Sequence, residues 1–166
     1  RHYQVKRTVH PTSGDTLSEL LVQANFHNDR VACSNLRTPP VRVALSLRKH
    51  ASAAGRVLTL LTIDYEAARP LPPDADRALH LRLDRATMIP VRYGNPTRAT
   101  RNGASETMQY VVTAAQLREI VAAERTSARL TGRAGRCEFP ISGQARGLIG
   151  MFTERELRPV DGREGL

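Results

Sequence analysis

Apolar and polar residues alternate with a period of two along much of this 166-residue chain, and this pattern constrains the fold more than any other feature. Residues 79–83 show it most clearly, because leucine occupies every second position. The period is typical of a half-buried β-strand, whereas the apolar side of a helix repeats about every 3.6 residues. Clusters of glycine, proline and asparagine separate the alternating segments, as turns between strands do. We therefore expect a mainly β chain.

About eight strands follow from this pattern. They include residues 3–9, 41–47, 57–63, 79–83, 89–93 and 108–112. The segment 57–63 is apolar on both faces, which places it near the middle of a sheet. The stretch from Leu20 to Phe26 alternates too, although Thr16 and Glu19 upstream form the capping box of a helix. We favour a strand for this stretch.

Two short helices are expected in the last third of the chain. Thr113 and Gln116 form a capping box, and apolar residues at helical spacing follow it. Ser142 is a suitable N-cap for a second helix, whose predicted apolar face is Leu148, Met151 and Phe152. Three glycines weaken this helix, each by up to about 1 kcal/mol relative to alanine. We expect these glycines to allow close approach to a neighbouring sheet.

The order of these elements defines the fold class. Strands joined by short turns favour antiparallel pairing, and the chain shows no regular alternation of strands and helices that would predict a parallel sheet. The sequence therefore predicts an α+β protein of mainly β type, with an antiparallel β-sandwich or open barrel of about eight strands and two short C-terminal helices. Residues 1–166 are expected to form a single domain, which is a usual length for one domain.

Two cysteines, Cys33 and Cys137, each lie beside a predicted strand. In an oxidising compartment they are expected to form a disulfide. The bond would span 137 − 33 = 104 positions. In the chain-entropy model a cross-link of this length stabilises a fold by about 4 to 5 kcal/mol. The alternatives are two buried reduced thiols, or a catalytic Cys33 with a histidine such as His27 as its base.

The chain is strongly basic, with a formal net charge of +9, and only two of its 25 basic residues are lysines. Arginine binds phosphate and carboxylate groups through a planar fork of N–H donors, which suits them better than the lysine ammonium. The charge also predicts a general attraction to anionic surfaces that weakens with salt.

Arginines in two regions are the best candidate binding residues. Arg125, Arg129 and Arg133 are all at odd positions of one predicted strand, so they lie on the same face of it. Further arginines lie in or beside residues 94–103, which we expect to form an exposed, mobile loop. If these segments lie side by side, their arginines form one patch that binds phosphates or carboxylates. The alternative is a solvated arginine-rich face without a partner. The predicted binding residues are Arg92, Arg98, Arg101, Arg125, Arg129, Arg133 and Arg136.

The sequence contains no recognisable catalytic, metal-binding or cofactor-binding motif, and we predict none of these sites. The histidines lack the spacing of a helical metal site, and no phosphate-binding glycine loop or nucleophile elbow occurs. No stretch approaches the roughly 20 apolar residues that a membrane-spanning helix requires. Several carboxylates gather between positions 64 and 84, where a solvated loop is the preferred interpretation. They are Asp64, Glu66, Asp74, Asp76 and Asp84.

The end of the chain carries a family resemblance. Residues 129–143 contain the pattern Phe139-Pro-Ile141-Ser-Gly143, and Leu148 and Phe152 follow it. This ending resembles the close of small exported bacterial β-sandwich proteins, many of which have no assigned activity. The resemblance covers about the last third of the chain. It implies a setting outside the cytoplasm and transfers no site residue.

Three functions fit these observations. The preferred one is a non-enzymatic exported bacterial domain, periplasmic or secreted, that recognises a protein or an anionic envelope partner through its arginines. The second is a cytoplasmic basic domain that binds nucleic acid, which requires free thiols and steep salt dependence. The third is a small hydrolase whose site is assembled from scattered residues.

Overall fold

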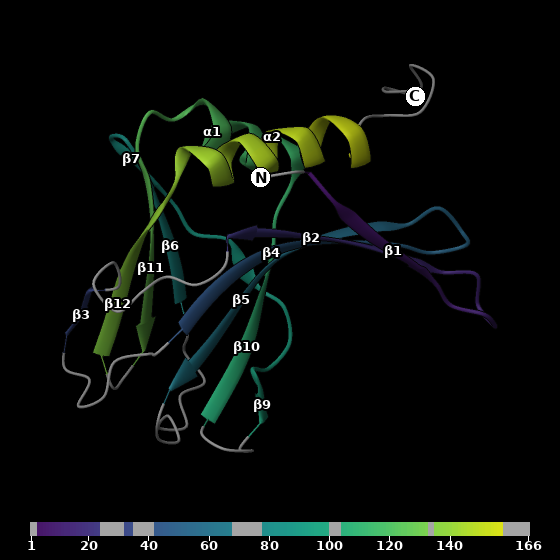
Figure 1. The fold of residues 1–166 in the computed structure, drawn as a ribbon, viewed down its shortest axis with the longest axis horizontal. Helices are drawn as coiled ribbons and strands as arrows, with labels where there is room; N and C mark the ends of the chain where they lie inside the picture. Colours follow the sequence, from purple (N-terminus) through teal and green to yellow (C-terminus); the bar gives the residue numbers. More distant parts are fainter. Residues whose placement is uncertain are drawn as a thin grey trace.

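The structure is a computed structural model, and it describes residues 3–23, 32–34, 42–67, 78–99, 104–132 and 135–157. Within these ranges the chain forms twelve strands and two helices (Figure 1). The predicted mainly β fold of α+β type is confirmed. The strands outnumber the expected eight because several of them contain only two or three residues.

The strands form two antiparallel sheets. The seven-stranded sheet has the order β1 (Val5–Val9), β2 (Thr16–Gln23), β4 (Arg42–Ala51), β5 (Val57–Ala67), β10 (Ala104–Val111) and β8 (Val91–Arg92), with β9 (Thr97–Ala99) also paired to β10. The five-stranded sheet has the order β3 (Ala32–Ser34), β12 (Gly135–Ile141), β11 (Thr126–Gly132), β6 (Ala78–Leu83) and β7 (Ala86–Met88). The two sheets do not close into a barrel, so the sandwich alternative describes the protein.

One hydrophobic core joins both sheets and both helices. Leu45 and Ile63 of the seven-stranded sheet, Leu81 of the five-stranded sheet, and Phe152 of the last helix are all fully buried. β6 follows the predicted alternation, because its three leucines are buried while the residues between them point the other way. This alternation gives the five-stranded sheet an apolar inner face and a polar outer face.

The positions of β2 and β5 in the seven-stranded sheet account for their sequence patterns. β2 is a strand between β1 and β4, as its alternation predicts, and Glu19 forms an ion pair with Arg48 at 3.2 Å instead of capping a helix. The end of this predicted strand, residues 24–26, lies outside the described residues. β5 lies between β4 and β10, in the middle of its sheet, as predicted. Leu60 and Leu61 point to opposite faces and are both 1% exposed, which explains why β5 is apolar on both sides.

The prediction for residues 89–93 was wrong about which side chains face the core. Ile89, Val91 and Tyr93 were expected to face the core, but they are 59%, 73% and 47% exposed, whereas Met88 and Pro90 are buried. Pro90 has no N–H to donate to a ladder, and it separates β7 from β8. Met88 is opposite Leu81 of β6 in the ladder, so the inner face passes from odd positions in β6 to even positions in β7, and the odd positions 89, 91 and 93 point outward.

The predicted loop of residues 94–103 is partly a strand, since β9 pairs with β10 inside it. This correction has a simple physical cause. The edge of β10 offers unpaired backbone groups beyond the two residues that β8 covers, and β9 satisfies them. Residues 100–103 of that prediction lie outside the described residues.

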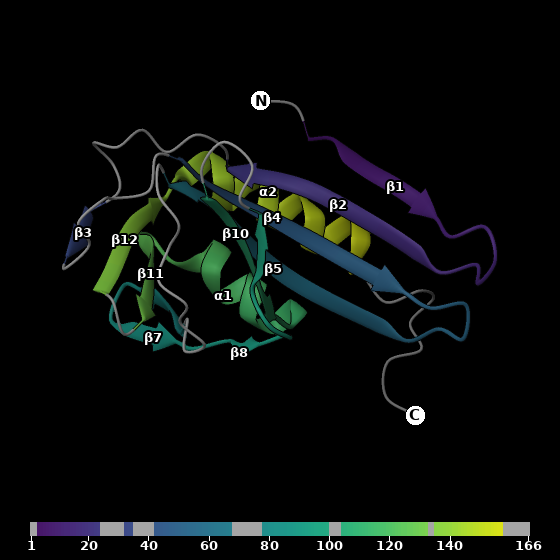
Figure 2. The ribbon, with the colours of Figure 1, turned by 90° about the horizontal axis from the view of Figure 1, so that it is seen from below.

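Both helices lie at one end of the sheets (Figure 1), and Figure 2 shows α2 running along β2. α1 (Ala114–Ala122) begins at the predicted capping box, in which the Gln116 N–H donates to the Thr113 hydroxyl at 3.1 Å. α2 (Gly143–Glu156) begins after Ser142, whose hydroxyl accepts a hydrogen bond from the Ala145 N–H at 3.1 Å. Both N-caps were predicted correctly.

The packing of α2 corrects two expectations. Of the three residues expected on its apolar face, Phe152 is buried, whereas Met151 is 39% exposed and Leu148 is half-buried. The glycines were expected to face a sheet. Gly150 instead faces α1, because a Cβ atom placed there would lie 3.4 Å from Cγ1 of Val121.

Polar contacts fix the ends of α2. The side chain of Gln23 at the end of β2 donates to the carbonyl of Pro140 at 3.2 Å and accepts from the N–H of Ser142 at 3.1 Å. At the other end, the buried carboxylate of Glu156 forms an ion pair with Arg7 at 2.5 Å. These contacts join the two sheets at one corner and hold α2 against the seven-stranded sheet.

The predicted disulfide is present. Cys33 of β3 and Cys137 of β12 are directly opposite each other in the ladder, and their sulfur atoms are bonded. The alternatives with free thiols are therefore wrong for this structure, and His27, the suggested base, lies outside the described residues. The bond fastens the short edge strand β3 to the five-stranded sheet.

Candidate anion-binding face and pocket

The outer face of the five-stranded sheet carries charged and polar side chains in register. Arg129 of β11 is opposite Glu138 of β12 and His80 of β6, and Ser127 is opposite Arg82. The inner-facing neighbours of these residues form the core, so their own side chains point away from it. We call this surface the basic face and define it as His80, Arg82, Ser127, Arg129, Arg136 and Glu138.

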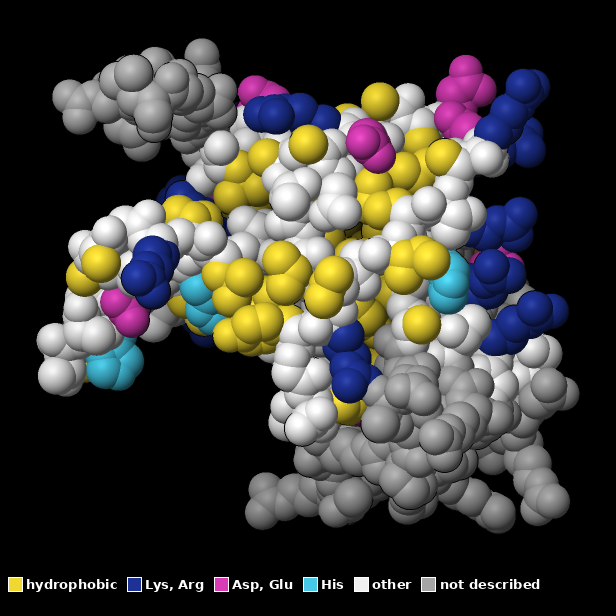
Figure 3. All heavy atoms as spheres, turned by 180° about the vertical axis from the view of Figure 1, so that it is seen from behind, with side chains coloured by type: hydrophobic (Ala, Val, Ile, Leu, Met, Phe, Trp, Pro, Cys, Tyr) yellow, Lys and Arg dark blue, Asp and Glu magenta, His cyan; other side chains and the backbone are white. Residues whose placement is uncertain are grey.

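Positive charge exceeds negative charge on the basic face. It holds three arginines and one carboxylate, that of Glu138. Glu138 accepts a hydrogen bond from the Ser127 hydroxyl at 3.1 Å and forms an ion pair with Arg82 at 3.5 Å. Arg136 is exposed and has no ion pair within the described part of the chain. Figure 3 shows lysine and arginine side chains gathered along the side of the molecule that carries this sheet.

Two nitrogen atoms on the basic face are buried without a hydrogen-bond partner. They are Nε of Arg129 and Nδ1 of His80, on residues that face each other across β11 and β6. Buried polar atoms are usually hydrogen-bonded, so an unpaired one requires an explanation. A ligand or ordered water between these two side chains would supply the missing partners.

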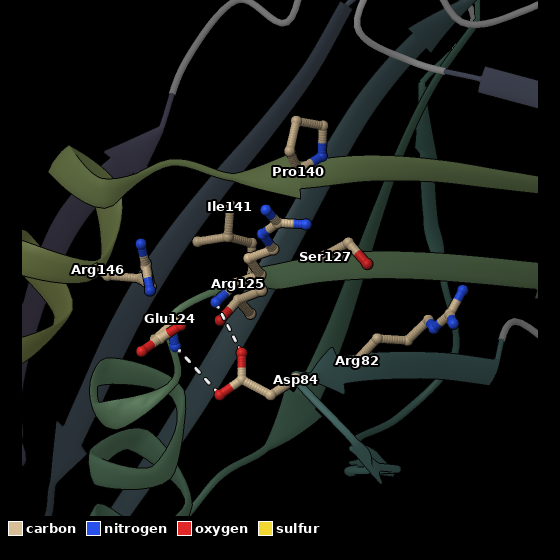
Figure 4. A pocket seen from close by; sticks show the side chains of 9 residues that line it. Arg82, Asp84, Glu124, Arg125, Ser127, Pro140, Ile141 and Arg146 are labelled. Carbon is tan, nitrogen blue, oxygen red and sulfur yellow. Dashed lines mark hydrogen bonds between the residues drawn. The ribbon is translucent and has the colours of Figure 1, made fainter.

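A pocket of about 460 Å³ opens at the end of the basic face, where β6 and α1 both end. Its wall includes arginines from three different elements: Arg82 from β6, Arg125 from the connection between α1 and β11, and Arg146 from α2 (Figure 4). In Figure 4 the side chain of Arg82 extends away from Arg146, so Arg82 lies at the rim. The pocket also contains two carboxylates, those of Asp84 and Glu124.

Asp84 is an exposed residue of the pocket wall. Its carboxylate accepts hydrogen bonds from the N–H groups of Arg125 at 2.9 Å and of Glu124 at 3.2 Å, and its own N–H donates to the Arg125 carbonyl at 3.1 Å. The residue has a φ of +49°, in the left-handed region that aspartate tolerates better than most residues. The two backbone N–H groups hold the pKa of Asp84 below its ordinary value of 3.8, since hydrogen bonds to the charged form favour it.

Arg146 connects the two helices at the pocket wall. Its guanidinium group donates to the carbonyl of Ala123, the C-cap residue of α1, while its Nε atom is buried without a partner. A cation at the C-terminus of a helix is favoured by the helix dipole. The positive charge of Arg146 is therefore fixed in place by α1.

The predicted binding residues divide between the two sheets. Arg129 and Arg136 lie on the basic face, and Arg125 lines the pocket. Arg92 is in β8, and the backbone of Arg98 is in β9, both in the seven-stranded sheet. The proposed single patch required the two regions to lie side by side, and they belong to different sheets. Arg101 and Arg133 lie outside the described residues.

The sequence analysis did not predict His80, Arg82, Ser127 and Glu138 of the basic face or Glu124 and Arg146 of the pocket, and it assigned Asp84 to a solvated loop. The first two had a usable signal, because the leucine alternation of β6 places them on the outer face. The pairing of β6 with β11, which brings them beside Arg129, has no signal in the sequence. Arg146 and Asp84 depend on the packing of α1 against its neighbours.

A second cavity lies between β2 and α2 and has a different character. It measures about 210 Å³, and the described residues of its wall include no charged side chain. They are Val22, Gln23, Ser142, Gln144, Ala145, Gly147, Leu148 and Met151. The charged pocket is therefore the better candidate for an ionic ligand.

No group of three or more histidine, cysteine, aspartate or glutamate side chains in the described residues is arranged to hold a metal ion. Neither α1 nor α2, the helices of the described part of the chain, is long and apolar enough to span a membrane.

The carboxylates noted in the sequence do not form one group. Asp64 of β5 accepts a hydrogen bond from Thr107 in the seven-stranded sheet, whereas Asp84 follows β6 in the five-stranded sheet. Asp74 and Asp76 lie outside the described residues.

No family model, curated protein or solved structure matches this chain. The resemblance to small exported β-sandwich proteins therefore stays a prediction.

Proposed function

We propose that this chain is a non-catalytic recognition domain of an exported protein, and that it binds an anionic partner through the basic face. The observation that carries the proposal is the register of the five-stranded sheet. It gathers Arg82, Arg129 and Arg136 on one face, where the defined residues include a single carboxylate, that of Glu138. The partner we propose is a protein segment or envelope polymer that carries closely spaced carboxylates.

The sheet supports recognition by holding the guanidinium groups at fixed spacing. Neighbouring strands lie about 4.8 Å apart, and side chains on one face repeat at every second residue along each strand. Arginine and carboxylate form paired, charge-assisted hydrogen bonds that are stronger than bonds between neutral groups. A rigid array loses less conformational entropy on binding than arginines on a loop would.

The disulfide supports the proposed location. Structural disulfides persist in oxidising compartments and are rare in the cytosol. The bond between Cys33 and Cys137 therefore fits a periplasmic or secreted domain.

Nucleic-acid binding receives less support. Proteins that bind single strands without sequence preference stack the bases on aromatic side chains. The two tyrosines closest to the predicted arginines are Tyr93 and Tyr110, and both follow or lie in strands of the seven-stranded sheet. Tyr110 is fully buried, and the basic face as defined contains no phenylalanine, tyrosine or tryptophan.

Binding of poly-L-glutamate at several salt concentrations tests the proposal. The Arg129→Ala/Arg136→Ala double variant is expected to bind about tenfold more weakly, since each lost ion pair costs up to about 1 kcal/mol and tenfold corresponds to about 1.4 kcal/mol. Arg56→Ala is the matched control, because it removes an exposed arginine from the turn between β4 and β5. It should change affinity less than about twofold.

A loss of binding free energy in the double variant no larger than twice that of Arg56→Ala, which removes one charge and not two, would show that net charge, and not the basic face, attracts the polymer. An oligonucleotide of the same charge serves as a competitor. If it bound more tightly than poly-L-glutamate, and the double variant lost that binding, the nucleic-acid alternative would replace the present proposal.

A further inference from the structure

The pocket beside the basic face holds charges of both signs. Arg125 and Arg146 line one part of its wall, Asp84 and Glu124 line another, and Arg82 lies at the rim (Figure 4). We propose that this pocket binds an amino dicarboxylate, a ligand with one ammonium and two carboxylate groups. The inference rests on the proposed function, because it identifies the chemical group of the anionic partner that the pocket accepts.

The arginines and carboxylates of the pocket do not form ion pairs with one another. The ion pairs found among the described residues do not join Arg125 or Arg146 to Asp84 or Glu124. A purely structural cluster of two cations and two anions would be expected to form such pairs, since isolated charges of opposite sign attract at short range. The arrangement leaves both signs available to a ligand.

The positive wall suits a carboxylate. Arg125 is exposed and has no ion pair among the described residues, and Nε of Arg146 is buried without a hydrogen-bond partner. Arg82 shares only a 3.5 Å contact with Glu138, so most of its N–H donors remain free for a second carboxylate at the rim. Arg125 and Arg146 line the pocket wall, and Arg82 extends away from Arg146 at its rim (Figure 4).

The negative part of the wall suits an ammonium group. Each carboxylate oxygen of Asp84 accepts one backbone N–H, which leaves each oxygen one further lone-pair site. Glu124 is exposed and follows the C-terminus of α1, where the helix dipole also favours a cation. A ligand that carried only negative groups would be repelled by these two carboxylates.

The size of the pocket is consistent with a small molecule or a terminal residue. Its volume of about 460 Å³ lies within the range of small-molecule sites. The pocket is continuous with the basic face through Arg82, so a polymer could lie along the sheet while one amino dicarboxylate unit enters the pocket.

Titration calorimetry with three small probes tests the inference. L-glutamate carries all three groups, glutarate lacks the ammonium, and L-glutamine lacks the second carboxylate. We expect L-glutamate to bind at least about fivefold more tightly than either of the other probes. A fivefold ratio corresponds to about 1 kcal/mol, which is less than one hydrogen bond to a charged group typically contributes.

Variants assign the contacts to residues. Glu124→Gln should weaken L-glutamate binding and leave glutarate binding unchanged or stronger, because the lost charge faces the ammonium. Arg125→Met should weaken both. Glu119→Gln, an exposed carboxylate on α1, and Arg56→Ala are the matched controls and should leave both affinities unchanged.

The outcomes separate this inference from the proposed function. Glutarate binding as tightly as L-glutamate, or equal effects of Glu124→Gln on both, would overturn the amino dicarboxylate. Absence of binding by all three probes at millimolar concentration, with poly-L-glutamate still bound, would overturn the pocket and leave the basic face. Binding of L-glutamate without any binding of poly-L-glutamate would support the pocket and overturn the proposed function.

Discussion

At the scale of single residues, Asp84 contributes most to the geometry of the site. Its carboxylate and backbone form hydrogen bonds with the backbone of Glu124 and Arg125, the residues that follow α1. These bonds determine the position of the Arg125 backbone at the pocket. The sequence places Asp84 after the last leucine of β6 but gives no indication of its hydrogen bonds. Its partners lie about 40 positions away along the chain, so only the fold brings them to the carboxylate.

Asp84 predicts a pH dependence of stability. The pKa of Asp84 is lowered in the folded protein, so its contribution to stability is present above the unfolded value of about 3.8 and is lost as the pH falls through the folded value. Asp84→Asn should therefore lower Tm at pH 7, and the difference from the unmodified protein should shrink below about pH 4. Thermal unfolding across this range measures it. A difference that grows toward acid pH would contradict the assignment.

At the scale of elements, sequence patterns correctly predicted the features that depend on interactions between residues close together in the chain. The capping box of α1, the N-cap Ser142 and the alternation of β6 all correspond to interactions within a few residues. The prediction that Ile89, Val91 and Tyr93 face the core was wrong because β7 pairs with β6 in a register that places the even position 88 opposite Leu81 on the inner face. The period of an alternating segment does not show which of its two faces packs against the core.

The glycines of α2 provide a test at this scale. A Cβ atom placed at Gly147 would have no neighbouring atom within 4 Å, whereas one at Gly150 would lie 3.4 Å from Val121. Gly147→Ala should therefore raise the free energy of unfolding by about 0.5 to 1 kcal/mol through helix propensity alone. Gly150→Ala should gain less, because the added methyl group meets the side chain of Val121. Urea unfolding of both variants compares them, and a larger gain at Gly150 would contradict this packing of α2.

At the scale of the whole molecule, the sequence predicted the fold class and the disulfide but not the arrangement of the sheets. Arg129 and Arg136 could be selected as candidates from the sequence, yet the strand order that brings Arg82 beside them is a long-range property. For the same reason the sequence does not show that Arg92 and Arg98 lie in the other sheet. Strand pairing depends on packing of the entire core, which one sequence does not display.

The disulfide is expected to stabilise the whole fold. It joins positions 104 residues apart, so the Cys33→Ser/Cys137→Ser variant should lose about 4 to 5 kcal/mol in its free energy of unfolding. Guanidinium unfolding of the oxidised protein and of the variant measures this loss. Two thiols that react with an alkylating reagent in the denatured, unreduced protein would instead show that the bond is absent.

The most direct test of the central claim is the mapping of poly-L-glutamate binding by amide chemical shifts of the intact protein. We predict that the perturbed residues lie on β6, β11 and β12, with Arg82, Arg129 and Arg136 among the largest changes. Perturbations centred on the seven-stranded sheet, or spread evenly over the surface, would contradict recognition through the basic face.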